Sequence, residues 1–143
     1  MKSKLKISIL GLGYVGLPLS LELSKFFNII GFDISKKRVL ELNKNIDSTK
    51  EIKFNNIKKK NIKFTNNHKL LKYSNFYIVT VPTPVNKKNI PDLKNIISAS
   101  NLIGQYLKIN DIVVYESTVY PGLTEEICVP ILEKKSKLKF NKD

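Results

Sequence analysis

The segment 6–16 constrains the fold of this chain more than any other, because a short apolar run leads directly into three closely spaced glycines. The spacing Gly11-x-Gly13-x-x-Gly16 comes just before a helical pattern that starts near Leu17. In a dinucleotide site the first glycine permits a tight turn and the second lets a pyrophosphate approach the backbone. The third lets the helix pack closely on the strand, and the helix N-terminus then attracts the phosphates.

The residues after this turn matter because three glycines at that spacing are weak evidence alone. A second apolar run, 28–32, follows the helical pattern and leads into Asp33. The separation of about 20 residues between Gly13 and Asp33 is typical of a carboxylate that binds the adenosine ribose hydroxyls. Strand, turn, helix, strand and acid in this order predict a dinucleotide-binding βαβ unit. A flavodoxin-like or other α/β fold with an incidental glycine turn is the alternative.

The composition fits one compact domain over residues 1–143, of which 42% are hydrophobic. No apolar run approaches the ~18 residues of a membrane span, and the N-terminus lacks a secretory signal pattern. Cys128 is the single cysteine, so it forms no intramolecular disulfide and fits a reducing compartment. We therefore expect a cytoplasmic protein without a membrane partner.

The net charge of +13 permits nucleic-acid binding but does not favour it. Nearly all the positive charge is lysine, with Arg38 the only arginine, and it is scattered among Asn and Ile residues. These three residue types share A/T-rich codons, so genome composition accounts for the trend. The lysine cluster 58–60 has no interleaved aromatic residues on which bases would stack. We expect no nucleic-acid partner.

Apolar runs alternate with helical patterns along the whole chain, which predicts a doubly wound parallel α/β sheet. Expected strands are 4–10, 29–33, 62–65, 76–81 and 111–116, and expected helices are 15–25, 68–73, 92–107, 124–134 and one capped by Ser35. Right-handed crossovers then give the strand order 3-2-1-4-5. The loops 11–16, 81–84 and 116–121 and Asp33 converge at one rim of that sheet, where a ligand binds.

Five segments together resemble the UDP-glucose/GDP-mannose dehydrogenase family. They are 11–18 (GLGYVGLP), 31–33 (GFD), 81–84 (VPTP), 91–93 (PDL) and 115–122 (YESTVYPG). The last segment is most similar to the branch that oxidises UDP-N-acetylhexosamines for surface polysaccharides. The resemblance covers essentially the whole chain and implies its NAD-binding Rossmann domain, truncated before the sixth strand of that domain.

Members of this family oxidise the C6 hydroxyl of a UDP-sugar to a carboxylate with two NAD+ in succession, through an aldehyde and a cysteine thioester. The resemblance places the catalytic cysteine, lysine and asparagine, the UDP-sugar-binding domain and the dimerising helix beyond residue 143. It therefore implies a homodimer or higher oligomer for a longer protein, and an inactive 143-residue chain. A UDP-glucose 6-dehydrogenase, or a non-catalytic NAD-binding module from a truncated gene, is the alternative.

The resemblance also assigns roles on the adenosine side of the site. Asp33 is expected to bind the ribose hydroxyls and to repel a 2′-phosphate, which favours NAD over NADP. A helix-capping role beside Ser35 is its alternative. Arg38 matches the basic residue near the adenosine, with a solvated helix face as the alternative. The backbone N–H groups of Tyr14 and Val15 are the expected pyrophosphate donors, although their side chains are compatible with packing.

On the nicotinamide side, Thr83 matches a residue near the ribose, or is a simple turn residue. Thr118 matches the threonine near the nicotinamide and the reacting C6, and is the one catalytic candidate in the chain; a helix-entry cap is its alternative.

Cys128 lies in an apolar helical pattern and is expected to pack in the core, and His68 to be inert. No spacing of His, Cys or carboxylates suits a metal. The run 112–115 has no charged residue or proline, so as a sheet edge it predicts self-association.

Overall fold

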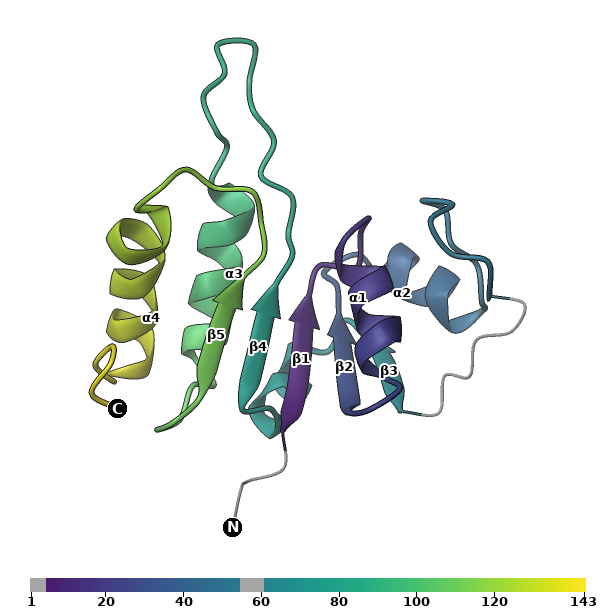
Figure 1. Cartoon of the computed structure of the whole chain (residues 1–143), viewed down its shortest axis with the longest axis horizontal. Coiled ribbons are helices and arrows are strands. Elements are labelled where there is room, and N and C mark those ends of the chain that lie inside the picture. The colour runs from purple at the N-terminus through teal and green to yellow at the C-terminus, as the bar shows by residue number, and fades with distance from the viewer. Residues whose placement is uncertain (1–4, 55–60) are drawn as a thin grey trace.

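A five-stranded parallel sheet runs through this computed structural model, which describes residues 5–54 and 61–143 (Figure 1). The strands are β1 Lys6–Leu10, β2 Asn28–Phe32, β3 Ile62–Thr65, β4 Phe76–Val79 and β5 Ile112–Tyr115. Their spatial order is β3-β2-β1-β4-β5, and every neighbouring pair is parallel. The expected doubly wound sheet is confirmed. The lysine cluster 58–60 and the expected first residue of β1, Lys4, lie outside the described residues.

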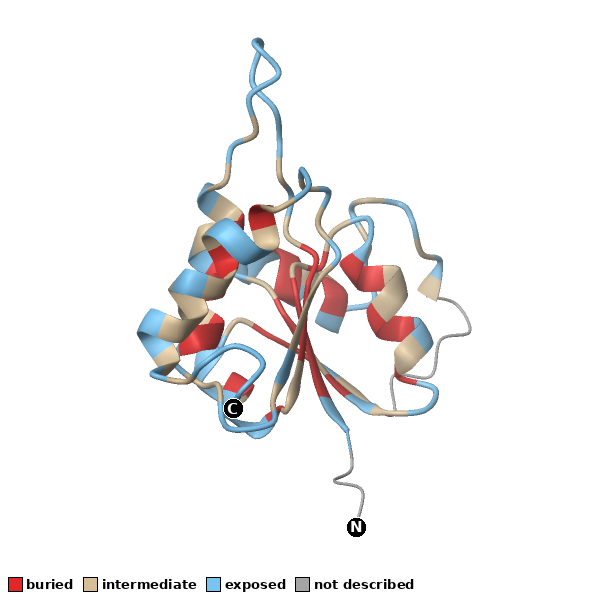
Figure 2. Cartoon of the chain, turned by 60° about the vertical axis from the view of Figure 1, so that its left-hand side comes forward, coloured by how far each residue is buried: buried red, intermediate tan, exposed pale blue. Residues whose placement is uncertain are grey.

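Helices cover both faces of this sheet, and Figure 2 shows the buried strands between the two helical layers. The helices are α1 Gly16–Leu23, α2 Lys36–Asn43, the 3-10 helix η2 His68–Tyr73, α3 Lys94–Gly104, the π-helix η3 Thr124–Cys128 and α4 Val129–Ser136. Ile7 and Ile9 of β1 pack with side chains of α1, whereas Leu10 packs with α3 and η3. Apolar side chains of β1 thus pack against helices on both faces of the sheet, as is typical of a central strand in a parallel sheet.

Polar side chains inside the sheet are paired with one another or with backbone carbonyls. The hydroxyls of Ser8 and Ser74 lie 2.6 Å apart in the core. The Tyr77 hydroxyl lies 3.1 and 3.2 Å from the carbonyl oxygens of Leu71 and Ser74 and can donate to either. In the described parts of the chain, no buried side-chain nitrogen or oxygen lacks a partner. These bonds join η2 and the residue after it to β1 and β4.

The last helix differs from the regular one that the sequence predicts over 124–134. It begins as a π-helix at Thr124–Cys128, and the Val129 N–H donates to the Thr124 carbonyl five residues earlier. Pro130 explains the wider turn, because proline has no N–H to donate and its ring would clash with a carbonyl four residues before it. The strands β2, β4 and β5 also end earlier than expected, which leaves Asp33 and residues 80–81 in loops at the rim.

Cys128 lies in this π-helix and is fully buried in the cluster formed with α3, which confirms its expected packing role. Burial raises the pKa of its thiol, although the neighbouring Ser100 and Tyr115 hydroxyls act in the opposite direction. We expect a thiol-specific reagent such as iodoacetamide to leave the native protein unmodified at pH 8 and to alkylate it fully in urea, since a thiolate is the reacting form. Mass spectrometry measures both; rapid alkylation of the native chain would contradict this packing.

No helix in the described ranges has the length and apolar character needed to cross a bilayer. β5 is an edge strand of the sheet as expected. Self-association through that edge stays a prediction, which sedimentation over a range of concentrations tests.

Candidate functional site

A cavity of about 400 Å³ opens at the carboxyl ends of β1 and β2, beside the first turns of α3. Its walls come from the glycine turn, from the residues after β2, and from one face of α3. They include Gly11, Leu12, Gly13, Asp33, Ser35, Arg38, Thr49, Val81, Pro82, Asn95, Ser98, Ala99 and Leu102. This is the switch point between β1 and β4, where doubly wound sheets bind ligands.

The glycine turn forms the floor of the cavity, and its three glycines meet different demands. Gly11 has a φ of +98°, which strongly favours glycine, and its N–H donates to the Phe32 carbonyl at 2.9 Å. A Cβ on Gly16 would overlap the Gly11 carbonyl oxygen and the Thr80 hydroxyl. A Cβ on Gly13 would meet nothing within 4 Å. Gly16 therefore serves packing, whereas Gly13 leaves an open approach to the backbone.

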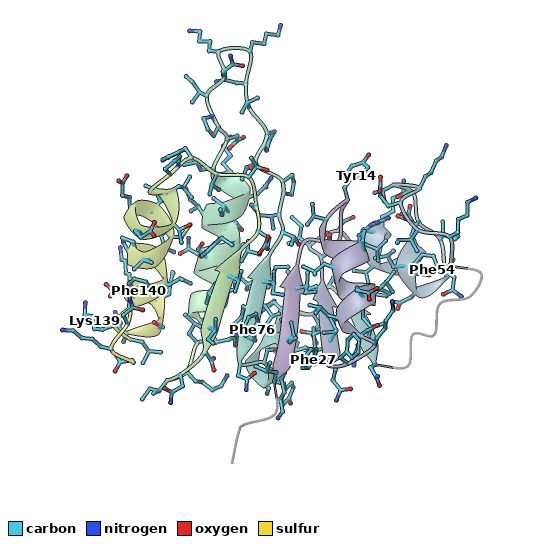
Figure 3. All side chains as sticks on the ribbon, in the orientation of Figure 1. Tyr14, Phe27, Phe54, Phe76, Lys139 and Phe140 are labelled. Carbon is cyan, nitrogen blue, oxygen red and sulfur yellow. The ribbon has the colours of Figure 1, made fainter. Side chains whose placement is uncertain are left out.

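Thr80, the residue just after β4, holds the turn in place, a contact that sequence reasoning missed. Its side-chain hydroxyl lies 2.7 Å from the Gly11 carbonyl oxygen and 3.0 Å from that of Leu10, and it can donate to either. Its backbone N–H also donates to the Leu10 carbonyl at 2.9 Å. The carbonyls at the start of the turn are thus bonded to Thr80, just beyond the end of β4. Tyr14 points away from the body at this turn (Figure 3) and is 67% exposed.

Asp33 joins the turn to the entrance of α2. Its carboxylate accepts the Leu12 N–H and the Ser35 N–H, each at 2.9 Å. Both of its expected roles are therefore compatible with its position, since it holds the backbone before α2 and also lines the cavity. Ser35 caps α2 as expected, by accepting the Arg38 N–H at 3.1 Å.

Arg38 is buried, so the alternative of a solvated helix face is wrong. Its Nε donates to the Leu12 carbonyl at 2.8 Å, and its Nη2 pairs with the Asp47 carboxylate at 2.8 Å. The Arg38 side chain is 10% exposed and the Asp47 side chain 0%. The irregular segment after α2 is thereby fastened to the glycine turn through one arginine.

This ion pair makes stability depend on pH. Burial acts to raise the Asp47 pKa, but hydrogen bonds from Thr49, Ile52 and Arg38 outweigh it and hold the pKa below its usual 3.8. The ionised Asp47 carboxylate therefore contributes fully to folding stability above its usual pKa. That contribution is lost as the pH falls through the lower pKa of the folded state. We expect the free energy of unfolding in urea to be higher for the wild type than for Asp47→Asn at pH 6. This difference should shrink below pH 4. A difference that is unchanged in acid would contradict this assignment.

Thr83 and Thr118 lie together at the other end of the rim, outside the cavity. The Thr83 hydroxyl donates to the Thr118 carbonyl at 2.5 Å, which joins the loops after β4 and β5. The segment 82–91, which contains Thr83, rises as a hairpin well above the sheet (Figure 1). The Asn86 side-chain oxygen accepts the N–H groups of Lys88 and Ile90 at 2.8 and 3.0 Å and organises its tip.

The structure thus brings together two groups of the expected residues. Gly11, Gly13, Asp33 and Arg38 line the cavity, while Thr83 and Thr118 contact each other beyond it. Sequence reasoning missed the α3 wall, whose residues Asn95, Ser98, Ala99 and Leu102 recur on one helical face. Only their spacing of three and four residues along the expected helix 92–107 marks them in the sequence, and no motif does.

Comparison with known proteins gives a consistent picture. A family model described as "UDP-glucose/GDP-mannose dehydrogenase family, NAD binding domain" matches residues 5–143. UDP-N-acetyl-D-glucosamine 6-dehydrogenase of Salmonella typhi is 50% identical over 141 residues, which are 98% of this chain and 33% of that protein. The enzyme of the same name from Pseudomonas aeruginosa is 51% identical over 97% of this chain and 33% of its own length.

A solved structure agrees at the level of the fold. That of NDP-N-acetyl-D-galactosaminuronic acid dehydrogenase from Methanosarcina mazei superposes with a TM-score of 0.88 at 28% identity, over 99% of this chain and 33% of that one. The chain thus spans about a third of the length of the relatives that it matches.

Proposed function

Because this chain belongs to the UDP-glucose/GDP-mannose dehydrogenase family as its NAD-binding domain, we propose that it serves a dehydrogenase that oxidises the C6 hydroxyl of a UDP-N-acetylhexosamine. The observation that carries this proposal is the identity of 50% with a UDP-N-acetyl-D-glucosamine 6-dehydrogenase over 98% of the chain. The C6 oxidation and the polysaccharide pathway come from the resemblance of the motifs. The buried thiol Cys128 fits a cytoplasmic location, which belongs to the same proposal.

In this proposal the adenosine half and the nicotinamide half of the cofactor bind at opposite ends of the rim. We place the adenosine in the cavity, with its ribose hydroxyls on Asp33 and its base beside Arg38 and the α3 wall. The pyrophosphate lies over Gly13, where no side chain blocks the approach, and accepts the N–H groups of Tyr14 and Val15. Gly11 and Gly16 shape that turn.

The nicotinamide half then extends toward Thr83 and Thr118, whose loops are joined by their hydrogen bond. NAD+ supplies the hydride acceptor for oxidation at C6. In this proposal Thr83 contacts the nicotinamide ribose, and the Thr118 hydroxyl holds a water beside the reacting carbon. Both side chains sit on loops at the carboxyl edge, where parallel sheets present catalytic groups.

The decisive experiment is to express the complete reading frame that encodes this sequence and to follow NADH with UDP-N-acetylglucosamine, UDP-N-acetylgalactosamine and UDP-glucose. The proposal expects turnover of an acetylated sugar. Preference for UDP-glucose would favour the UDP-glucose 6-dehydrogenase alternative. A frame that stops at residue 143 would favour the non-catalytic NAD-binding module.

The 143-residue polypeptide alone is expected to bind NAD+ but to produce no NADH with any of these sugars. Positioning of reactants can account for ~7–11 kcal/mol of a barrier, and this proposal uses the described cavity for the adenosine, so it gives the sugar no site there. Sustained NADH production by the purified chain, followed at 340 nm, would refute this expectation.

A further inference from the structure

We propose that Asp47 is a positioning residue for cofactor choice: it holds the Arg38 guanidinium away from the adenosine 2′ position, so that two carboxylates, not Asp33 alone, select NAD over NADP. This inference rests on the placement of the adenosine in the cavity between Asp33 and α3. Asp47 itself comes from the irregular segment after α2, where the sequence shows no motif.

A cation in this wall of the cavity needs an explanation. Dinucleotide sites that accept NADP use an arginine near the end of the second strand to bind the 2′-phosphate. Arg38 stands five residues after Asp33 and lines the same cavity as Asp33 and Ser35. An unrestrained guanidinium here would therefore attract the phosphate that Asp33 repels.

The contacts of Arg38 show how that attraction is removed. Its Nε donates to the Leu12 carbonyl at 2.8 Å, and its Nη2 contacts the Asp47 carboxylate at 2.8 Å. Its Nη1 donates to the Ser48 hydroxyl at 3.2 Å, and Nη2 reaches that of Thr49 at 3.5 Å. All three nitrogens of the guanidinium thus have protein partners, and the Arg38 side chain is 10% exposed.

Hydrogen bonds hold the Asp47 carboxylate in place, so it stays paired with the Arg38 guanidinium when a ligand binds. One carboxylate oxygen accepts the Thr49 hydroxyl at 2.7 Å and the Thr49 N–H at 3.1 Å. The other accepts the Ile52 N–H at 2.9 Å. Hydrogen bonds to a carboxylate are stronger than those between neutral groups, so this buried acid keeps its orientation.

The charges around the arginine add to the effect. Glu41 lies 3.9 Å from Nη1 of Arg38 and accepts the Ser48 hydroxyl at 2.8 Å. Asp47 and Glu41 thus both face this guanidinium, and Asp33 lines the same cavity, so three carboxylates lie in this region with one arginine. A further phosphate, with two negative charges near neutral pH, is disfavoured by this arrangement.

The test compares binding of NAD+ and NADP+ to the full 143-residue chain by calorimetric titration. Asp47→Asn keeps the shape and an acceptor oxygen but removes the charge, while Asp33 stays in place. We expect the NADP+ affinity relative to NAD+ to rise on the order of tenfold, the size of one charge-assisted hydrogen bond. Glu22→Gln, at an exposed ion pair on α1, makes the same charge change and should leave the ratio unaltered.

Two further variants separate this role from simple support of the fold. In Arg38→Gln combined with Asp47→Asn the gain for NADP+ should vanish, and Asp47→Glu should retain the wild-type ratio. Equal losses for both cofactors in Asp47→Asn, or a gain that persists without Arg38, would overturn the inference. If Asp47→Asn does not fold by circular dichroism, Asp47→Ser keeps an acceptor for the Thr49 N–H and allows the same comparison. Failure of the wild type to bind either cofactor would instead overturn the placement of the adenosine.

Discussion

Gly16→Ala is expected to lose roughly 3 kcal/mol of folding stability, the upper part of the range for overpacking a core. The added methyl would overlap the Gly11 carbonyl oxygen and the Thr80 hydroxyl. The Gly11 carbonyl is bonded to the Thr80 hydroxyl, and a backbone group cannot move aside as a flexible side chain does. α1 must therefore shift away from β1 and β4, and the glycine turn is lost with it. Urea unfolding followed by circular dichroism measures the change.

Gly13→Ala is the matched control, since its methyl meets no atom within 4 Å. We expect its free energy of unfolding to stay within about 0.5 kcal/mol of wild type. Its affinity for NAD+ should fall, because the methyl occupies the approach of the pyrophosphate. The two alanines thus separate folding from binding. Equal stability of both variants would contradict the packing at Gly16, and unchanged NAD+ binding by Gly13→Ala would contradict the path of the pyrophosphate.

Asp33→Ala is expected to weaken NAD+ binding by about 1–3 kcal/mol, the cost of leaving polar groups without partners. The carboxylate would bind the ribose hydroxyls, and it already holds the N–H groups of Leu12 and Ser35 that shape this end of the cavity. Calorimetric titration with both cofactors gives the change. The loss for NADP+ should be smaller, since the repulsion of a 2′-phosphate disappears as well.

Asp33→Asn is the control for shape, because its amide oxygen can still accept one backbone N–H. We expect it to bind NAD+ with intermediate affinity and to unfold close to wild type. If Asp33→Ala leaves NAD+ affinity unchanged, Asp33 only holds the start of α2, and its ribose role is wrong.

The order of the strands could be predicted from the sequence because each step follows a local rule. The apolar runs mark buried strands, helical patterns separate them, and right-handed crossovers leave one arrangement of the sheet. The cap at Ser35 was equally local, since a serine three residues before Arg38 is within reach of its N–H. Gly16 could be assigned to close packing for the same reason.

Contacts between distant or irregular segments could not be predicted. The Thr80 hydroxyl meets the glycine turn almost 70 residues away, through a register that only the assembled sheet defines. The ion pair of Arg38 with Asp47 depends on an irregular segment that shows no helical or strand pattern in the sequence. A solvated Arg38 was therefore equally compatible with the sequence. Pro130 falls inside the expected helix 124–134, where a proline signals a break or a kink, but it does not by itself predict that the helix begins with a π-helical turn.

The central place of β1 has a consequence for the order of assembly during synthesis. One edge of this strand pairs with β2, where Lys6 meets Asn28, but the other waits for β4, where Ile7 meets Phe76. Ribosomes need roughly 2–10 s to make the stretch between those two partners, at about 5–20 residues per second. Throughout that interval the nascent chain presents an unpaired apolar strand edge, which invites association with other chains. The risk that this central strand pairs wrongly is therefore greatest during synthesis of that stretch, and pairing with β4 removes it for β1.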